Sequence, residues 1–109
     1  MTEETKVHSG SGNVFADLGL PNSDELLIKA ELVHQISELI SEQKLTQVEA
    51  AEILGIDQPK VSALVRGKLS GFSTERLFRF LNALGSSVEI RVIPKSASNI
   101  QAQTRVVSV

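Results

Sequence analysis

The chain has 109 residues, enough for one domain with a modest core and some flexible tail, and too few for a large multi-step enzyme. It contains no cysteine, which excludes disulfides and thiolate metal sites, and no apolar stretch has the length of a membrane span or a secretory signal. The net charge of −2 does not by itself favour a nucleic-acid partner, and the composition predicts a soluble, cytoplasmic protein.

The charge is distributed unevenly along the sequence. Residues 1–57 contain 11 acidic and 3 basic side chains, a net −8, whereas residues 58–109 contain 2 acidic and 8 basic ones, a net +6. A basic half carried on an acidic body fits a protein that presents one face to phosphates. Taken alone, this asymmetry does not establish nucleic-acid binding.

Residues 1–21 form the first predicted segment. Residues 1–13 include a Ser/Gly-rich run and lack apolar periodicity, so we expect them to be flexible. Residues 14–20 form a short apolar island, which includes Phe15 and Leu18. The island either folds back and closes one end of the core, or stays partly exposed until a partner protein covers it.

A long amphipathic helix is predicted from Asn22 to Lys44. Asn22 is a suitable N-cap, with Glu25 at the third helical position. The glutamates on the polar face are interpreted as a solvated surface, and His34 has no cysteine or second nearby histidine with which to bind a metal. The positions expected to face the core are Leu32, Val33, Ile36, Leu39 and Ile40.

Residues 45–68 predict two short helices joined by a tight turn. Thr46 and Glu49 have the spacing of a capping box, in which each side chain accepts the backbone N–H of the other residue. The first helix runs to Leu54. Gly55 follows, and glycine readily adopts the left-handed conformation that ends a helix.

The second short helix is predicted to begin at Asp57. Pro59 in its first turn supports this start, because the N–H that proline lacks would be unpaired there in any case. Gly67 ends the helix. The core-facing positions are Val61, Leu64 and Val65, and the outward ones are Gln58, Lys60, Ser62, Ala63 and Arg66.

The stretch 45–68 resembles the helix-turn-helix of the Xre/Cro repressor-like family. Gln47 opens the first helix, Ala51 and Gly55 lie four residues apart, and Val61 and Leu64 fill the family's buried positions. The resemblance implies that the second helix lies in the DNA major groove and that the first abuts the phosphate backbone. It assigns base reading to Gln58 and Lys60, and backbone contacts to Gln47, Ser62, Arg66 and Lys68. The alternative is a hairpin that serves only as a packing unit.

A further helix is predicted from Ser73, which can cap it, to Gly85, and its apolar stripe completes the core. Arg76 and Arg79 on this helix either extend the basic surface or form a solvated face, so they are not assigned to the site.

Residues 86–94 change to a period of two, in which Val88, Ile90 and Val92 alternate with charged residues, as in a β-strand with one buried face. A lone strand leaves N–H and C=O groups unpaired, so we expect these three residues to mediate a homodimer by pairing with their copies. The alternative is pairing with residues 105–109, at the end of the tail 95–109.

The sequence therefore predicts an all-α, repressor-like domain of four to five helices over residues 22–85, followed by a C-terminal β-strand. The resemblance implies a sequence-specific repressor that binds a double-stranded DNA operator, with no catalytic residue, metal, cofactor or membrane. The strand and the apolar island are similar to those of HigA-like antitoxins, which implies an RNA-cleaving toxin as partner, repression of its own operon, and Phe15 and Leu18 as candidate toxin contacts. A stand-alone or phage-type repressor without a toxin is the alternative.

Overall fold

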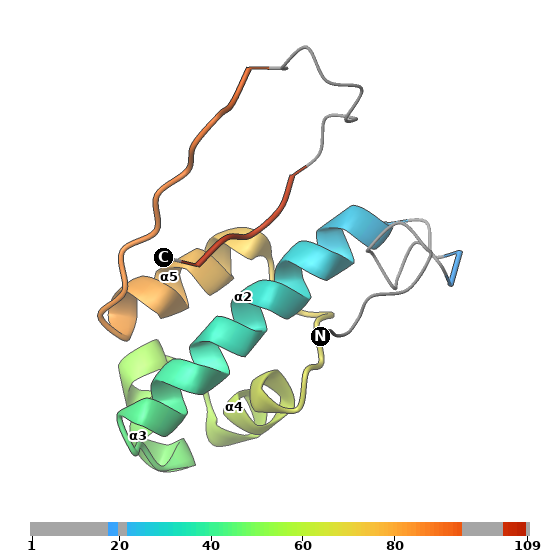
Figure 1. Ribbon diagram of the computed structural model, residues 1–109. Coiled ribbons are helices and arrows are strands. Elements are labelled where there is room, and N and C mark those ends of the chain that lie inside the picture. The colour runs from blue at the N-terminus through green and yellow to red at the C-terminus, as the bar shows by residue number, and fades with distance from the viewer. Residues whose placement is uncertain (1–17, 20–21, 95–103, 109) are drawn as a thin grey trace, which may run out of the picture.

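The computed structural model describes residues 18–19, 22–94 and 104–108. Its helices are α2 (Ser23–Glu42), α3 (Gln47–Leu54), α4 (Gln58–Val65) and α5 (Thr74–Ala83). Figure 1 shows α2 crossing the domain diagonally, with α5 on one side of it and α3 and α4 on the other. α2 contacts α4 and α5, and α3 contacts the same two helices. The predicted helical domain is confirmed.

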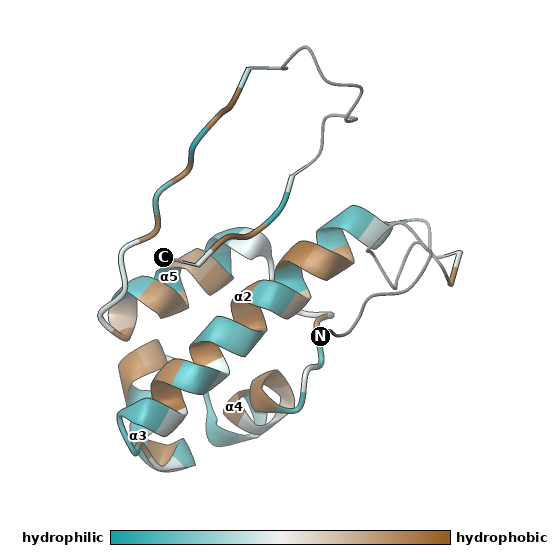
Figure 2. Cartoon of the chain, viewed as in Figure 1, coloured by the Kyte–Doolittle hydropathy of each residue, from teal (hydrophilic) through white to brown (hydrophobic). Residues whose placement is uncertain are grey.

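The core is built from apolar side chains that recur every three or four residues along each helix. Ile36 of α2, Leu64 of α4 and Leu77 of α5 are fully buried. Leu39, which was expected in the core, is half-buried and packs against it. Figure 2 shows hydrophilic and hydrophobic residues alternating along α2, as expected for a helix with one buried face. The buried set is Leu32, Val33, Ile36, Ile40, Ala50, Leu54, Val61, Leu64, Phe72, Leu77, Phe80, Leu81 and Leu84.

Side chains cap the first turns of α3, α4 and α5, at Thr46, Asp57 and Ser73 respectively. Each of these residues has an extended backbone, which aims its side-chain oxygen at the N–H groups of the first turn. Asn22 is the N-cap residue of α2, as predicted, and its carbonyl accepts the Leu26 N–H at 3.0 Å, but the expected side-chain cap is not formed. Asn22 precedes α2 with φ −114° and ψ 44°, and its side chain makes no cap hydrogen bond.

Each helix is followed by a residue with a left-handed backbone: Lys44, Gly55, Gly67 and Gly85 in turn. These residues turn the chain so that later N–H groups satisfy carbonyls of the last helical turn. After α5, for example, the Ser86 N–H donates to the Leu81 carbonyl at 2.9 Å. The long helix predicted to run from Asn22 to Lys44 is therefore shorter than expected, because α2 ends at Glu42 and Lys44 has φ +55°.

The β-strand expected over residues 86–94 is not formed in the part of the chain that the structure describes. These residues, here called the C-terminal arm, leave the end of α5 and project from the helices (Figure 1). Val88 packs partly against the core, whereas Ile90 is 73% and Val92 89% exposed. A strand is defined by its ladder of hydrogen bonds to a neighbour, and no such ladder joins the arm to another of the described segments.

Residues 104–108 return to the helical domain. Val106 packs against the core, and the Gln35 side-chain amide of α2 donates to the Ser108 hydroxyl. No backbone hydrogen bond joins these described residues to the arm, so the alternative pairing within one chain is not formed between them. Val109, the last residue of that predicted pairing, lies outside the described residues.

Candidate nucleic-acid interface

α3 and α4 are short, and each has a well-defined start. The Thr46 hydroxyl accepts the Glu49 N–H at 3.1 Å, and the Glu49 carboxylate accepts the Thr46 N–H at 2.9 Å, so the predicted capping box is present. At α4 the Asp57 carboxylate accepts the Lys60 N–H at 2.9 Å. Gly55, with φ +72°, turns the chain between the two helices. These local hydrogen bonds fix where each helix begins, and Gly55 redirects the chain between them.

The two neighbouring alanines of α3 differ in burial. Ala50 is completely buried, whereas Ala51, the predicted crossing residue, is half-buried and lines a groove on the surface. The Ala51 carbonyl accepts the N–H groups of both Gly55 and Ile56, at 2.9 and 3.1 Å. Ala50 therefore belongs to the core, and the Ala51 backbone holds the turn.

One side of α4 is buried and the other is exposed. Val61 and Leu64 are fully buried. Gln58, Pro59 and Lys60 are exposed, while Ser62 and Ala63 are half-buried. The prediction that Val65 faces the core is wrong. Its side chain is 36% exposed, although it lies four residues after the buried Val61 and so only about 40° from it around the helix. Val65 is the last residue of α4.

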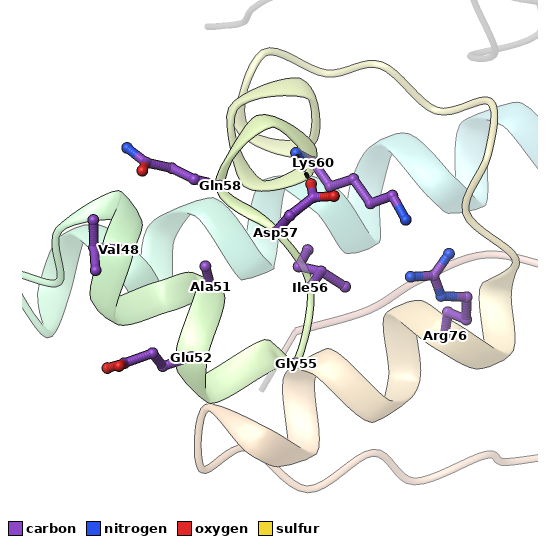
Figure 3. Close-up of a pocket in the computed structure, with 9 residues that line it drawn as sticks. All are labelled: Val48, Ala51, Glu52, Gly55, Ile56, Asp57, Gln58, Lys60 and Arg76. Carbon is purple, nitrogen blue, oxygen red and sulfur yellow. Dashed lines mark hydrogen bonds between the residues drawn. The ribbon is translucent and has the colours of Figure 1, made fainter.

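The two predicted base readers point away from each other. Figure 3 shows Gln58 and Lys60 leaving the first turn of α4 in opposite directions, with the Lys60 ammonium directed toward Arg76. Residues two apart on a helix are separated by about 200° around its axis, so their side chains do not converge. Gln58 and Lys60 can therefore each contact a different part of one surface, but not the same atom.

The four predicted backbone contacts lie at the start of α3, within α4 and just after α4. Gln47 is exposed as the first residue of α3, and Lys68 is exposed in the connection after α4. Arg66 follows α4 directly, and its Nε donates to the Ser62 carbonyl at 3.3 Å. This bond draws the guanidinium back along α4 and leaves its terminal nitrogens available to a further acceptor.

An open groove of about 470 Å³ lies between α3, the turn, the start of α4 and α5 (Figure 3). It brings Gln58 and Lys60 together with Arg76, a residue that sequence reasoning does not assign to the site. The only sequence signal for Arg76 is a basic side chain three residues after a helix cap, which does not locate it beside α4. The lining is Val48, Ala51, Glu52, Gly55, Ile56, Asp57, Gln58, Lys60 and Arg76.

The other predicted sites lie elsewhere. Val88, Ile90 and Val92 are on the C-terminal arm, Leu18 is 70% exposed, and Phe15 lies outside the described residues. Within the described ranges, no three or more His, Cys, Asp or Glu side chains are grouped so that they could hold a metal ion. None of the described helices has both the length and the apolar character needed to cross a membrane.

Comparison with known proteins agrees with this geometry. A helix-turn-helix domain model matches residues 14–93, and the chain belongs to this family. It is also similar to a solved structure assigned to the XRE family of transcriptional regulators. The two share 44% sequence identity, with 82% of this chain and 100% of that chain covered and a TM-score of 0.78. No curated protein matches the sequence.

Proposed function

We propose that this protein is a DNA-binding transcriptional regulator of the XRE type, and specifically a sequence-specific repressor that occludes a promoter. The observation that carries the proposal is the α3–α4 hairpin. It presents the exposed first turn of α4 on the side opposite the buried Val61 and Leu64. In helix-turn-helix proteins this arrangement places the second helix in the major groove.

In the proposed complex with DNA, Gln58 and Lys60 contact base edges at different positions, since they leave α4 in opposite directions. Glutamine can bond in a bidentate manner to adenine, and lysine can donate to guanine. Gln47, Ser62, Arg66 and Lys68 are assigned to the sugar-phosphate backbone, where contacts position the protein without reading sequence.

A gel shift tests the repressor function directly. The full chain is titrated against the DNA upstream of its own gene and against unrelated DNA of equal length. We expect tighter binding to the upstream DNA, by a factor that persists as the salt concentration rises, because base contacts release no counterions. Equal affinity for both DNAs at every salt concentration would contradict sequence-specific repression.

We further propose that the protein acts as a homodimer on an operator of two half-sites. The support is the C-terminal arm, which carries exposed Ile90 and Val92 on a backbone without ladder hydrogen bonds in the described structure. A second copy of the arm, related by two-fold symmetry, would satisfy both the backbone groups and the apolar side chains.

The antitoxin function is a narrower proposal. It is supported by the exposure of Leu18 and by the net charge of −8 over residues 1–57, which suits a basic, RNA-cleaving toxin. The competing candidate is a stand-alone repressor with no toxin partner. The two are separated by co-expressing the chain with the neighbouring gene and testing for co-purification.

Phe15→Ala and Leu18→Ala refine that experiment. If these residues contact the toxin, the double variant loses the co-purifying protein while its thermal stability and DNA affinity stay unchanged. A lowered melting temperature with the complex intact would instead show that the segment is part of the core.

A further inference from the structure

The Arg76 side chain is held in one place by its surroundings. Its guanidinium carbon lies 5.2 Å from the ring centre of Phe72 and 5.5 Å from that of Phe80. Its Nη1 donates to the Gly71 carbonyl at 3.2 Å. Both rings are buried and meet edge to face, so the support beneath the guanidinium is part of the core. Much of the rotamer freedom of Arg76 is therefore lost before any ligand binds, which reduces the entropy cost of binding.

Arg76 and Lys60 approach the same end of the groove from different helices (Figure 3). The acidic lining residues form no ion pair with either cation. Glu52 lies at the opposite end of the groove, and the Asp57 carboxylate caps α4. Among the described residues, no carboxylate forms an ion pair with Arg76 or Lys60. The groove therefore has one end where two cations can receive an anion.

The position of this basic end relative to α4 indicates which anion it receives. An α-helix is about 10–12 Å across with its side chains, and the major groove is about 12 Å wide. A helix lying in the groove thus has a row of phosphates close to each flank. Lys60 leaves the first turn of α4 toward Arg76, so both cations lie on one flank of the proposed reading helix.

We infer that Arg76 is a further DNA-backbone contact, which binds a phosphate on the flank of α4 toward which Lys60 extends and so extends the interface from α4 to α5. Lys60 keeps its proposed contact with a base edge and adds positive charge to this flank. This inference rests on the proposed DNA-binding function and adds a positioning residue to it. The fork of guanidinium N–H groups not bonded to Gly71 suits a phosphate oxygen. Because a phosphate contact carries no base information, Arg76 fixes the register of α4 on the duplex and does not change its sequence preference.

The test measures operator affinity as a function of salt concentration for the full-length protein and three variants. Arg76→Gln removes the charge and keeps a polar side chain of similar reach. Arg76→Lys keeps the charge and loses the planar fork. Arg79→Gln is the matched control, since Arg79 is an exposed arginine three residues further along α5 and outside the groove lining.

We expect Arg76→Gln to reduce the slope of log affinity against log salt by about one counterion, while preference for the operator over unrelated DNA is retained. Between 50 and 200 mM salt, one counterion corresponds to a change in affinity of about three- to fourfold. Arg76→Lys should keep the slope and bind more weakly, and Arg79→Gln should match the wild type. Because the lysine variant keeps the charge and the aliphatic stem, it remains informative if Arg76→Gln does not fold.

Three results would overturn the inference. The first is that the salt slope of Arg76→Gln, or the operator affinity of Arg76→Lys, equals that of the wild type. The second is an equal loss of slope in Arg76→Gln and Arg79→Gln, which would reflect general charge. The third is preserved DNA binding in Arg76→Gln with loss of an acidic protein partner, which would assign the groove to that partner. If the wild-type chain binds no operator at all, the proposed function fails as well, and this outcome is seen before any variant is made.

Discussion

Gln58 is the residue on which base discrimination chiefly depends in the proposed complex. It is exposed in the first turn of α4 and directed away from Lys60. A good bidentate contact contributes roughly 1–3 kcal/mol of discrimination against the wrong base. Gln58→Ala should therefore weaken operator binding about 5- to 160-fold and relax the preference at one position in each half-site. Selection from randomised half-sites measures both effects, and an equal loss on operator and random DNA would remove Gln58 from base reading.

Arg66 and Lys68 should behave differently, because both are assigned to phosphates. Replacing either by Gln should weaken binding to operator and unrelated DNA by similar factors. The salt slope should fall by about one counterion in each single variant. Fluorescence anisotropy over a range of salt concentrations provides the measurement, with Arg79→Gln again as the control. A weakening confined to the operator would instead place the affected residue among the base readers.

Lys44 has a backbone conformation that most side chains disfavour. Its φ of +55° lies in the left-handed region, where a Cβ costs roughly 1–2 kcal/mol, although glycine loses more freedom on folding by about 0.5–1 kcal/mol. We expect Lys44→Gly to raise the free energy of unfolding by roughly 0.5–1 kcal/mol, as measured by urea denaturation.

Gly85→Ala is the opposite control for this prediction. Gly85 has φ +98°, and an added Cβ would meet no atom within 4 Å, so any loss of stability comes from the backbone conformation alone. By the same balance of strain and chain freedom, we expect a decrease of roughly 0.5–1 kcal/mol. If Lys44→Gly were destabilising while Gly85→Ala behaved as expected, the Lys44 side chain would have to make a stabilising contact that outweighs the strain.

At the level of elements, formation of the proposed dimer depends on the C-terminal arm. Proline lacks the N–H that a β-ladder requires, so Ile90→Pro should give a monomer with much weaker operator binding. Light scattering coupled to size exclusion measures the mass. Because Ile90 is 73% exposed, the thermal stability of the helical domain should be unchanged. Ile90→Thr keeps the N–H and should retain at least part of the dimer, whereas a fully dimeric proline variant would exclude the arm as the interface.

Some elements could be predicted from the sequence because the signals that set them are local. Thr46, Asp57 and Ser73 cap helices through N–H groups three residues away, so the starts of α3, α4 and α5 follow from short spacings. The end of α2 could not be predicted in this way, since Lys44 occupies the left-handed position where glycine usually signals the end of a helix. The strand pattern is also present, but a strand needs a partner that the pattern does not supply.

The groove could not be predicted, for a related reason. Arg76 takes its place from Phe72 and Phe80, whose rings meet through tertiary packing, and from the way α5 lies beside the turn between α3 and α4. The spacing of residues along α5 shows only that Arg76 is basic and near a helix start. The burial of Ala50 could not be predicted either. Ala50 and Ala51 have the same side chain, and only the direction in which the helix presents each one distinguishes them.

At the scale of the whole molecule, one hydrogen bond joins the ends of two helices that are distant in sequence. The Gln43 side-chain amide, at the end of α2, donates to the Leu84 carbonyl, at the end of α5, at 2.7 Å. The C-terminal arm begins two residues later, so this bond holds the base from which the arm leaves the domain.

In the proposed dimer, a small change in the angle at the base of the arm produces a large displacement at its tip. Nine extended residues span at most about 30 Å, so a tilt of about 10° at the base would move the tip by about 5 Å. That displacement exceeds the rise of one base pair, about 3.4 Å. The Gln43–Leu84 bond would then limit the angle between the arm and the helical domain. It would keep the two α4 helices of the dimer at the spacing that successive half-sites require, although neither residue is assigned a contact with DNA.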